Sequence, residues 1–88
     1  MIYLTGVRLN GGDTHEHIAS VRWKDPETAR TGESKRSLIV KWLRGGGEAR
    51  IAASAGWVEV AVVEADPPHI RARADGDWTN SLLALPRF

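Results

Sequence analysis

The chain has no cysteine among its 88 residues. Disulfide bonds are therefore excluded, and so is a zinc site built on thiolates. A small domain without such cross-links must be held together by packing, by a metal with other ligands or by association with another chain. The lack of cysteine also suits a reducing compartment, so we expect a cytoplasmic protein.

Long hydrophobic runs are missing as well. No stretch approaches the ~20 apolar residues that a membrane-spanning helix needs. The first ten residues, MIYLTGVRLN, have no positive cluster ahead of an apolar run, as a secretion signal would have. We therefore expect a soluble, single small domain over residues 1–88 that has no membrane partner.

The chain also has little net charge. A formal charge of +1 is too close to neutral to indicate nucleic acid by itself. The charges are unevenly spread, however, because residues 35–50 hold five basic residues and one acidic residue, whereas acidic residues are in excess elsewhere. This asymmetry indicates a surface for a partner.

Short stretches rich in strand-forming residues, several with alternating polar and apolar side chains, predict β-strands. The expected strands cover residues 2–10, 17–24, 50–54, 57–65 and 69–74, and an optional last strand runs from 77 into 83. Asp75-Gly76 is typical of a two-residue hairpin turn, and a turn at 55–56 joins the third and fourth strands. Residues 25–32 are expected to form a polar loop. The apolar strand at 57–65 belongs at the centre of the sheet.

One helix is predicted over residues 33–44, ended by three successive glycines at 45–47. Its apolar stripe consists of Leu38, Ile39, Trp42 and Leu43. This stripe should face Val58, Val60 and Val62 of the strand at 57–65, or the opposite face of that strand. Replacing a buried Trp42 by alanine would then cost about 3–5 kcal/mol.

This order of elements, β-β-α-β-β-β, predicts an α+β fold. We expect an antiparallel sheet of about five strands with the amphipathic helix packed on one face.

Several short motifs together resemble a known family. The strings GGDTHEHIASVRW, TGES, ADPP, DG and WTNSLLALP are similar to those of a family of small, mostly bacterial domains called domain of unknown function 3892. The likeness covers residues 4–88. It implies one compact domain that occurs as a stand-alone protein, and it supplies no catalytic residues that could be carried over.

His15 and His17 are the candidate metal ligands. On an extended chain their side chains point the same way, at the edge of the apolar face of the following strand. Imidazole nitrogens bind zinc, and a third ligand would have to come from Asp13, Asp66 or His69. Alternatively, the histidines bond to the backbone of the turn.

Signs of catalysis are few. No cysteine is available as a nucleophile, and the serines lack the glycine setting of a nucleophile elbow. The glycines at 45–47 follow a helix, whereas a phosphate loop precedes one. We therefore expect no cofactor and favour a non-catalytic protein.

A basic surface is the candidate binding site. It would combine helix residues with two from the strand at 69–74, and its members are Lys35, Arg36, Lys41, Arg44, Arg71 and Arg73. Such cations can meet phosphates, and Trp57 or Trp78, if exposed, could stack a base. Alternatively, these charges form an ordinary solvated face.

A protein partner is the third kind of candidate. The strand at 50–54 or the last strand is expected at a sheet edge, where a partner strand can add. The apolar segment 82–88 either docks on a second copy, giving a homodimer, or folds back over its own core. The leading hypothesis is a non-catalytic binding or assembly module. A nucleic-acid-associated protein comes second, and a metal-dependent activity at the histidines comes third.

Overall fold

The computed structural model describes residues 1–53 and 56–88. Its elements, in chain order, are β1 (Ile2–Leu9), η1 (His15–His17), β2 (Ile18–Lys24), β3 (Thr31–Lys35), α1 (Arg36–Arg44), β4 (Ala49–Ala53), β5 (Gly56–Val63), β6 (His69–Ala74), β7 (Asp77–Thr79) and η2 (Ser81–Ala84). The fold is α+β, as expected. Residues 54 and 55, on which the predicted turn at 55–56 and the predicted end of the third strand fall, lie outside the described residues.

The strands form one mixed sheet in the order β3-β2-β1-β4-β5-β6-β7. The expectation of an antiparallel sheet of about five strands was wrong, because the sheet has seven strands and β1 pairs with β4 in parallel. Chain reversal through β2, β3 and α1 supplies the long connection that a parallel pair requires. The parallel contact is short, with Ile2 opposite Ala49 and Tyr3 opposite Arg50.

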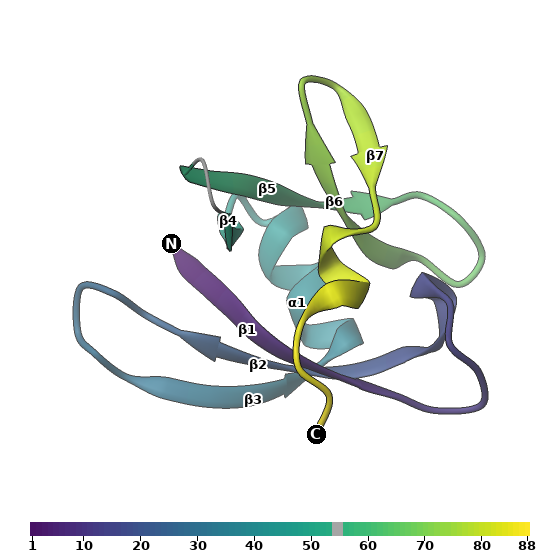
Figure 1. The fold of residues 1–88 in the computed structure, drawn as a ribbon, viewed down its shortest axis with the longest axis horizontal. Helices are drawn as coiled ribbons and strands as arrows, with labels where there is room; N and C mark the ends of the chain where they lie inside the picture. Colours follow the sequence, from purple (N-terminus) through teal and green to yellow (C-terminus); the bar gives the residue numbers. More distant parts are fainter. Residues whose placement is uncertain (54–55) are drawn as a thin grey trace.

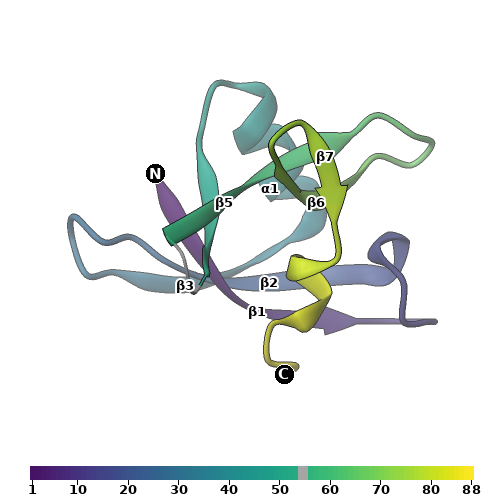
Figure 2. The ribbon, with the colours of Figure 1, turned by 45° about the horizontal axis from the view of Figure 1, so that its top comes forward.

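The two groups of strands diverge from this contact. In Figures 1 and 2, β1, β2 and β3 lie at one level and β5, β6 and β7 at another. In both views α1 lies behind the space between them and η2 lies in front of it. The helix and the short helical turn therefore fill the inside of a bent sheet from opposite sides.

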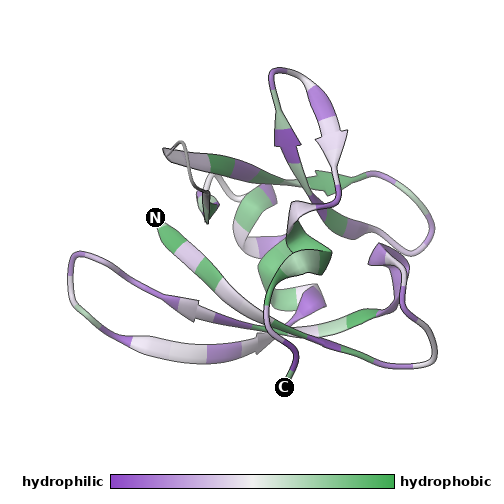
Figure 3. Ribbon diagram, in the orientation of Figure 1, coloured by the Kyte–Doolittle hydropathy of each residue, from purple (hydrophilic) through white to green (hydrophobic). Residues whose placement is uncertain are grey.

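The core between these layers is aliphatic, and Figure 3 shows hydrophobic segments on α1, η2 and the strands beside them. The strands contribute Leu4, Val7, Ile18, Val21, Ala49, Ile51, Val60, Ile70 and Ala72, α1 contributes Ile39 and Val40, and η2 contributes Leu82. Each of these residues is at most 4% exposed.

The predicted helix stripe is only partly confirmed. Ile39 is buried and Leu43 packs against the core, but Leu38 is 58% exposed and Trp42 is 44% exposed. Val40 is buried as well. The buried side of the helix is therefore turned from the predicted stripe toward Val40, by less than the roughly 100° that separates successive residues. The predicted loss of about 3–5 kcal/mol of unfolding free energy for Trp42→Ala assumed a buried side chain, and this assumption was wrong.

A strand stands where a loop and the first helical turn were predicted. β3 pairs with β2 from Thr31 opposite Lys24 to Lys35 opposite Ser20, and α1 begins only at Arg36. The sequence of β3, TGESK, has few strand-forming residues, so its pairing depends on what β2 offers. β2 offers a backbone ladder of five residue pairs, and in addition Trp23 Nε1–H donates to Ser34 Oγ at 3.1 Å.

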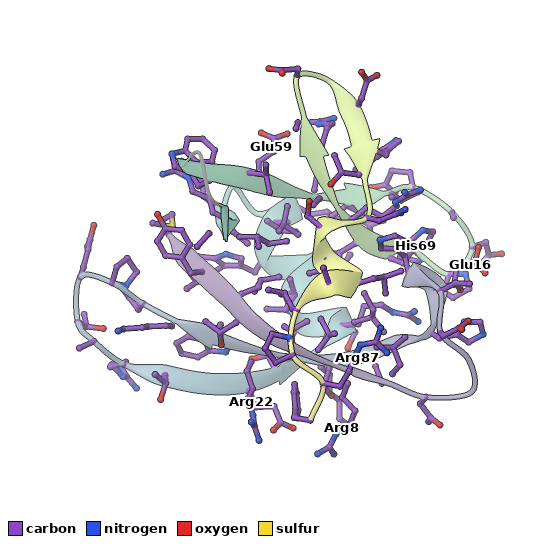
Figure 4. All side chains as sticks on the ribbon, viewed as in Figure 1. Arg8, Glu16, Arg22, Glu59, His69 and Arg87 are labelled. Atoms are coloured by element: carbon purple, nitrogen blue, oxygen red, sulfur yellow. The ribbon has the colours of Figure 1, made fainter. Side chains whose placement is uncertain are left out.

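The end of the chain folds back on its own core, which was one of the two alternatives for segment 82–88. The last predicted strand is short and gives way to η2, which buries Leu82 completely. Val7 N–H then donates to Pro86 O at 2.9 Å, and Phe88 N–H donates to Val7 O at 3.2 Å. The Phe88 ring lies beneath Arg8 and Arg22, which Figure 4 places next to this end of the chain.

The sheet edges are β3 and β7. The last strand was expected at an edge, and it is. The strand at 50–54 was also considered for an edge, and this was wrong, because β4 lies between β1 and β5. Neither α1 nor any other helix in the described ranges is long and apolar enough to cross a membrane.

Two leucine substitutions test this packing. Leu82→Ala should cost about 2–5 kcal/mol of unfolding free energy, because Leu82 is fully buried. Leu38→Ala should cost about 0.5 kcal/mol or less, because Leu38 is exposed on a helix where alanine is equally favourable. Urea unfolding of both variants measures the difference. Equal costs would contradict the placement of η2 in the core.

Candidate functional site: an indole–arginine face on β4–β7

Strand pairing brings polar and aromatic side chains together on the outer face of the sheet. Arg50 of β4 lies opposite Glu59 of β5, Glu59 lies opposite Arg73 of β6, and Arg73 lies opposite Trp78 of β7. Directly paired residues share a face, and so do residues two apart in a strand, which adds Trp57. We call these five residues the indole–arginine face. Figure 4 shows Glu59 pointing away from α1.

Local sequence explains this arrangement. In β5 Trp57 and Glu59 alternate with Val58 and Val60, and the two valines pack on the core. At the turn from β6 to β7, Asp75 and Gly76 both have positive φ, 52° and 84°. Two such residues form the tight hairpin turn whose twist suits antiparallel strands. The turn thereby sets the register that puts Trp78 opposite Arg73.

The two indoles on this face are exposed, Trp57 to 50% and Trp78 to 41%. Each is accompanied by a guanidinium group. The Cζ atom of Arg50 lies 3.7 Å from the ring centroid of Trp57, and that of Arg73 lies 5.4 Å from the ring centroid of Trp78. Both distances are within the range of attractive cation–π contacts.

Acidic side chains hold the two arginines as well. Arg73 Nε donates to Glu59 Oε1 at 2.8 Å, and Arg50 Nη2 donates to Glu48 Oε2 at 3.3 Å. The glutamates are largely exposed. Exposed ion pairs contribute only about 0–1 kcal/mol, so either arginine can exchange its glutamate for another anion at low cost.

Two grooves of ligand size run along this face. One, of about 470 Å³, is bordered by Arg44, Arg50 and Trp57. The other, of about 560 Å³, extends to the turn at Asp75 and Gly76. Trp57, Glu59 and Arg73 line both grooves. Both volumes lie within the range of small-molecule sites.

The six basic residues predicted as one surface are spread over the molecule. Arg44 and Arg73 line the first groove together. Arg44 also borders a hollow of about 300 Å³ that is lined by Arg36 and Lys41. Lys35 ends the edge strand β3. Arg71 lies inside a buried polar cluster, described below.

Arg44 is paired with an acidic side chain. Its Nη2 donates to Glu64 Oε2 at 2.6 Å. This hydrogen bond raises the pKa of Arg44 and lowers the pKa of Glu64 from their ordinary values. Both side chains are exposed, so the pair adds little to stability.

The sequence analysis did not identify Arg50 and Glu59 as members of the site. The signal that could have found them is the alternation of polar and apolar residues in β4 and β5, read together with their register. Register depends on the length of the connection between the strands, which sequence alone leaves open.

The predicted metal ligands His15 and His17 lie in η1, a 3₁₀ turn, and not on a strand. The premise that their side chains point the same way was therefore wrong, because a 3₁₀ turn has three residues per turn and rotates residues i and i+2 to different sides. His17 Nδ1 lies 2.7 Å from Thr14 Oγ1, whereas His15 is buried.

His15 joins a buried polar cluster with His69 and Arg71 of β6. Figure 4 places His69 at the start of β6, beside η1. Both histidines are 7% exposed, and His15 Nε2, His69 Nδ1 and Arg71 Nε have no hydrogen-bond partner within the described residues. Arg71 Nη2 donates to Asn80 Oδ1 at 3.2 Å. Burial, helped by the nearby Arg71 and His69, lowers the pKa of His15 to about 4.

His69, one of the three suggested third ligands, thus lies near His15. In residues 1–53 and 56–88 no group of three or more histidine, aspartate or glutamate side chains could hold a metal ion. Coordination by His15 and His17 stays a prediction.

Comparison with known proteins places the chain in a family. A family model described as "Protein of unknown function (DUF3892)" matches residues 4–86. The chain belongs to this family. No curated protein and no solved structure matches it significantly. The matched segment includes the indole–arginine face and the histidine cluster of this DUF3892 domain.

The lowered pKa of His15 predicts a pH-dependent stability. The unfolded chain, with an ordinary histidine pKa of 6.5, binds a proton at a higher pH than the folded chain, where the pKa is about 4. Stability should therefore be constant above pH 6.5 and fall between pH 6.5 and 4, by at most about 3 kcal/mol. Urea unfolding at several pH values measures this slope.

Two variants assign the slope to its residue. His15→Gln should flatten it, because the titrating group is gone. His17→Gln should keep it, because His15 remains in place. An unchanged slope in His15→Gln would contradict the assignment.

Proposed function

We propose that residues 1–88 form a non-catalytic binding domain and that its indole–arginine face binds single-stranded nucleic acid. The observation that carries the proposal is the presence of two exposed indoles on one sheet face, each with an arginine guanidinium over its ring. Exposed aromatic side chains on a sheet are a common platform for unpaired bases, which stack on them whatever their sequence.

The chemistry of the side chains assigns the bases to the aromatic rings and the phosphates to the arginines. Trp57 and Trp78 offer ring surface to two bases, and the Arg50 guanidinium offers a second flat surface. Arg44 and Arg73 border the same groove as Arg50, so three cations are available to phosphates that pass along it. Each of the three now pairs with an exposed glutamate, which a phosphate would replace.

The helix extends this path. Arg44 belongs both to the groove and to the neighbouring hollow that contains Lys41 and Arg36. A strand leaving the sheet face at Arg44 would therefore meet two further cations along α1. This arrangement uses four of the six basic residues singled out in the sequence and leaves out Lys35 and Arg71.

The other hypotheses gain less support. A homodimer through segment 82–88 loses its main argument, because that segment packs on β1 and the core of its own chain. Metal binding at His15 and His17 loses the shared direction of the two side chains.

Fluorescence anisotropy with labelled single strands of about ten nucleotides tests the proposal. With the three cations of the groove alone as phosphate contacts, affinity should fall at least about 20-fold when salt rises from about 50 to about 200 mM. Trp57→Ala and Trp78→Ala should each weaken binding about tenfold, as expected for the loss of one stacked base.

Trp42→Ala is the matched control, because this tryptophan is similarly exposed but lies on α1 and not on the indole–arginine face of β4–β7. It should leave the affinity unchanged. Absence of binding at low salt, or equal losses in all three tryptophan variants, would overturn the proposed function.

A further inference from the structure

A separate pocket, of about 330 Å³, lies between the β2–β3 hairpin and α1. Its lining includes the indoles of Trp23 and Trp42 and the aliphatic side chains of Ile2 and Leu38. We call it the aromatic pocket. Its volume is at the lower end of the range for small-molecule sites, and none of these residues lines either groove of the indole–arginine face.

Each indole in this pocket is seated on a glycine. A Cβ atom at Gly32 would come within 2.5 Å of the Trp23 ring, and one at Gly47 would overlap the Trp42 ring. Trp23 is further fixed by its hydrogen bond to Ser34 Oγ. Both rings are therefore held before any ligand arrives, so binding would not have to order them.

The pocket contains a carboxylate group, that of Asp25. Among the described residues that line it, Asp25 alone is ionisable. Its side chain is half-buried at the end of β2, and Oδ1 accepts the Glu27 N–H at 2.9 Å. One carboxylate oxygen is thus tied to the hairpin loop, which fixes the direction of the carboxylate and leaves the other oxygen available.

We propose that the aromatic pocket binds an alkylated ammonium cation. Aromatic faces attract a cation within about 6 Å of the ring centroid, and quaternary ammonium groups are commonly recognised this way. The aliphatic walls suit the methyl groups, and the carboxylate complements the charge. Anions are disfavoured for the same reason, so this site and the indole–arginine face select ligands of opposite charge.

The cation can be that of a free small molecule or that of a methylated lysine side chain, because both carry the same head group. Choline and a short peptide containing trimethyllysine represent the two sources. Tighter binding of the peptide would assign the site to a protein ligand, and equal or tighter binding of choline would assign it to a small molecule. Either order supports the recognised chemistry.

Titration followed by nuclear magnetic resonance tests the proposal on the full chain. Choline should shift the indole N–H signals of Trp23 and Trp42 in a saturable way and leave those of Trp57 and Trp78 in place. The neutral isostere 3,3-dimethyl-1-butanol should bind at least about tenfold more weakly, because it lacks the charge that the rings and Asp25 attract. Equal affinity for choline and its isostere, or no saturable shift, would overturn the proposal.

Variants separate charge from shape. Asp25→Asn keeps an oxygen for the Glu27 N–H and removes the charge, so it should weaken choline about tenfold and leave the neutral isostere unaffected. Trp42→Ala should abolish binding, and Trp57→Ala, outside the pocket, should not change it. Unchanged choline affinity in Asp25→Asn would refute the charge argument even if Trp42→Ala failed to fold.

Discussion

The short parallel contact between β1 and β4 is the constraint on which the rest of the molecule depends. Only two residue pairs join the halves of the sheet there, and two-stranded contacts of this length are marginal in water. Without disulfides, the halves are held by the aliphatic core between them. α1 closes this core on one side and η2 on the other, as Figures 1 and 2 show. Burying Leu82 and Ile39 is therefore what keeps the two groups of strands together.

An aliphatic core leaves the tryptophans for the surface. Trp42, Trp57 and Trp78 are between 41% and 50% exposed, and Trp23 is half-buried. Every one of them has a specific neighbour, which is a glycine for Trp23 and Trp42 and an arginine for Trp57 and Trp78. Exposed apolar groups that gather in this way mark binding surfaces more often than isolated ones do.

Sequence reasoning succeeded where a local pattern was enough. The apolar run of β5, the alternation in β6 and the Asp75-Gly76 turn predicted the strands that carry Trp57 and Trp78, because these signals lie within short stretches of the chain. It failed where the structure of a segment depends on contacts with other segments of the chain. β3 was missed because TGESK has few strand-forming residues and is extended through its pairing with β2. The helix stripe was misplaced because Leu38 and Trp42 are as apolar as the residues that are buried.

The histidines show a similar limit. The prediction for His15 and His17 assumed an extended chain. In the structure both residues lie in a 3₁₀ turn, so their side chains point to different sides, and His15 lies near His69 and Arg71 of β6. No local pattern in GGDTHEH announces that turn. His69 was named as a possible partner, but its proximity to His15 follows from the packing of η1 on β6, which is a tertiary contact between residues far apart in the chain.

The glycine run at 45–47 connects the two proposed sites. It was interpreted as a helix terminator, and Gly46, with φ of 97°, has the backbone that this role favours. Gly47 has a different role. It has no Cβ atom, which leaves room for the Trp42 ring to pack against its backbone. Gly47 also lines the groove beside Arg44 and Arg50. The residue that seats one wall of the aromatic pocket therefore forms part of the indole–arginine groove, so a side chain at position 47 would disturb both surfaces at once.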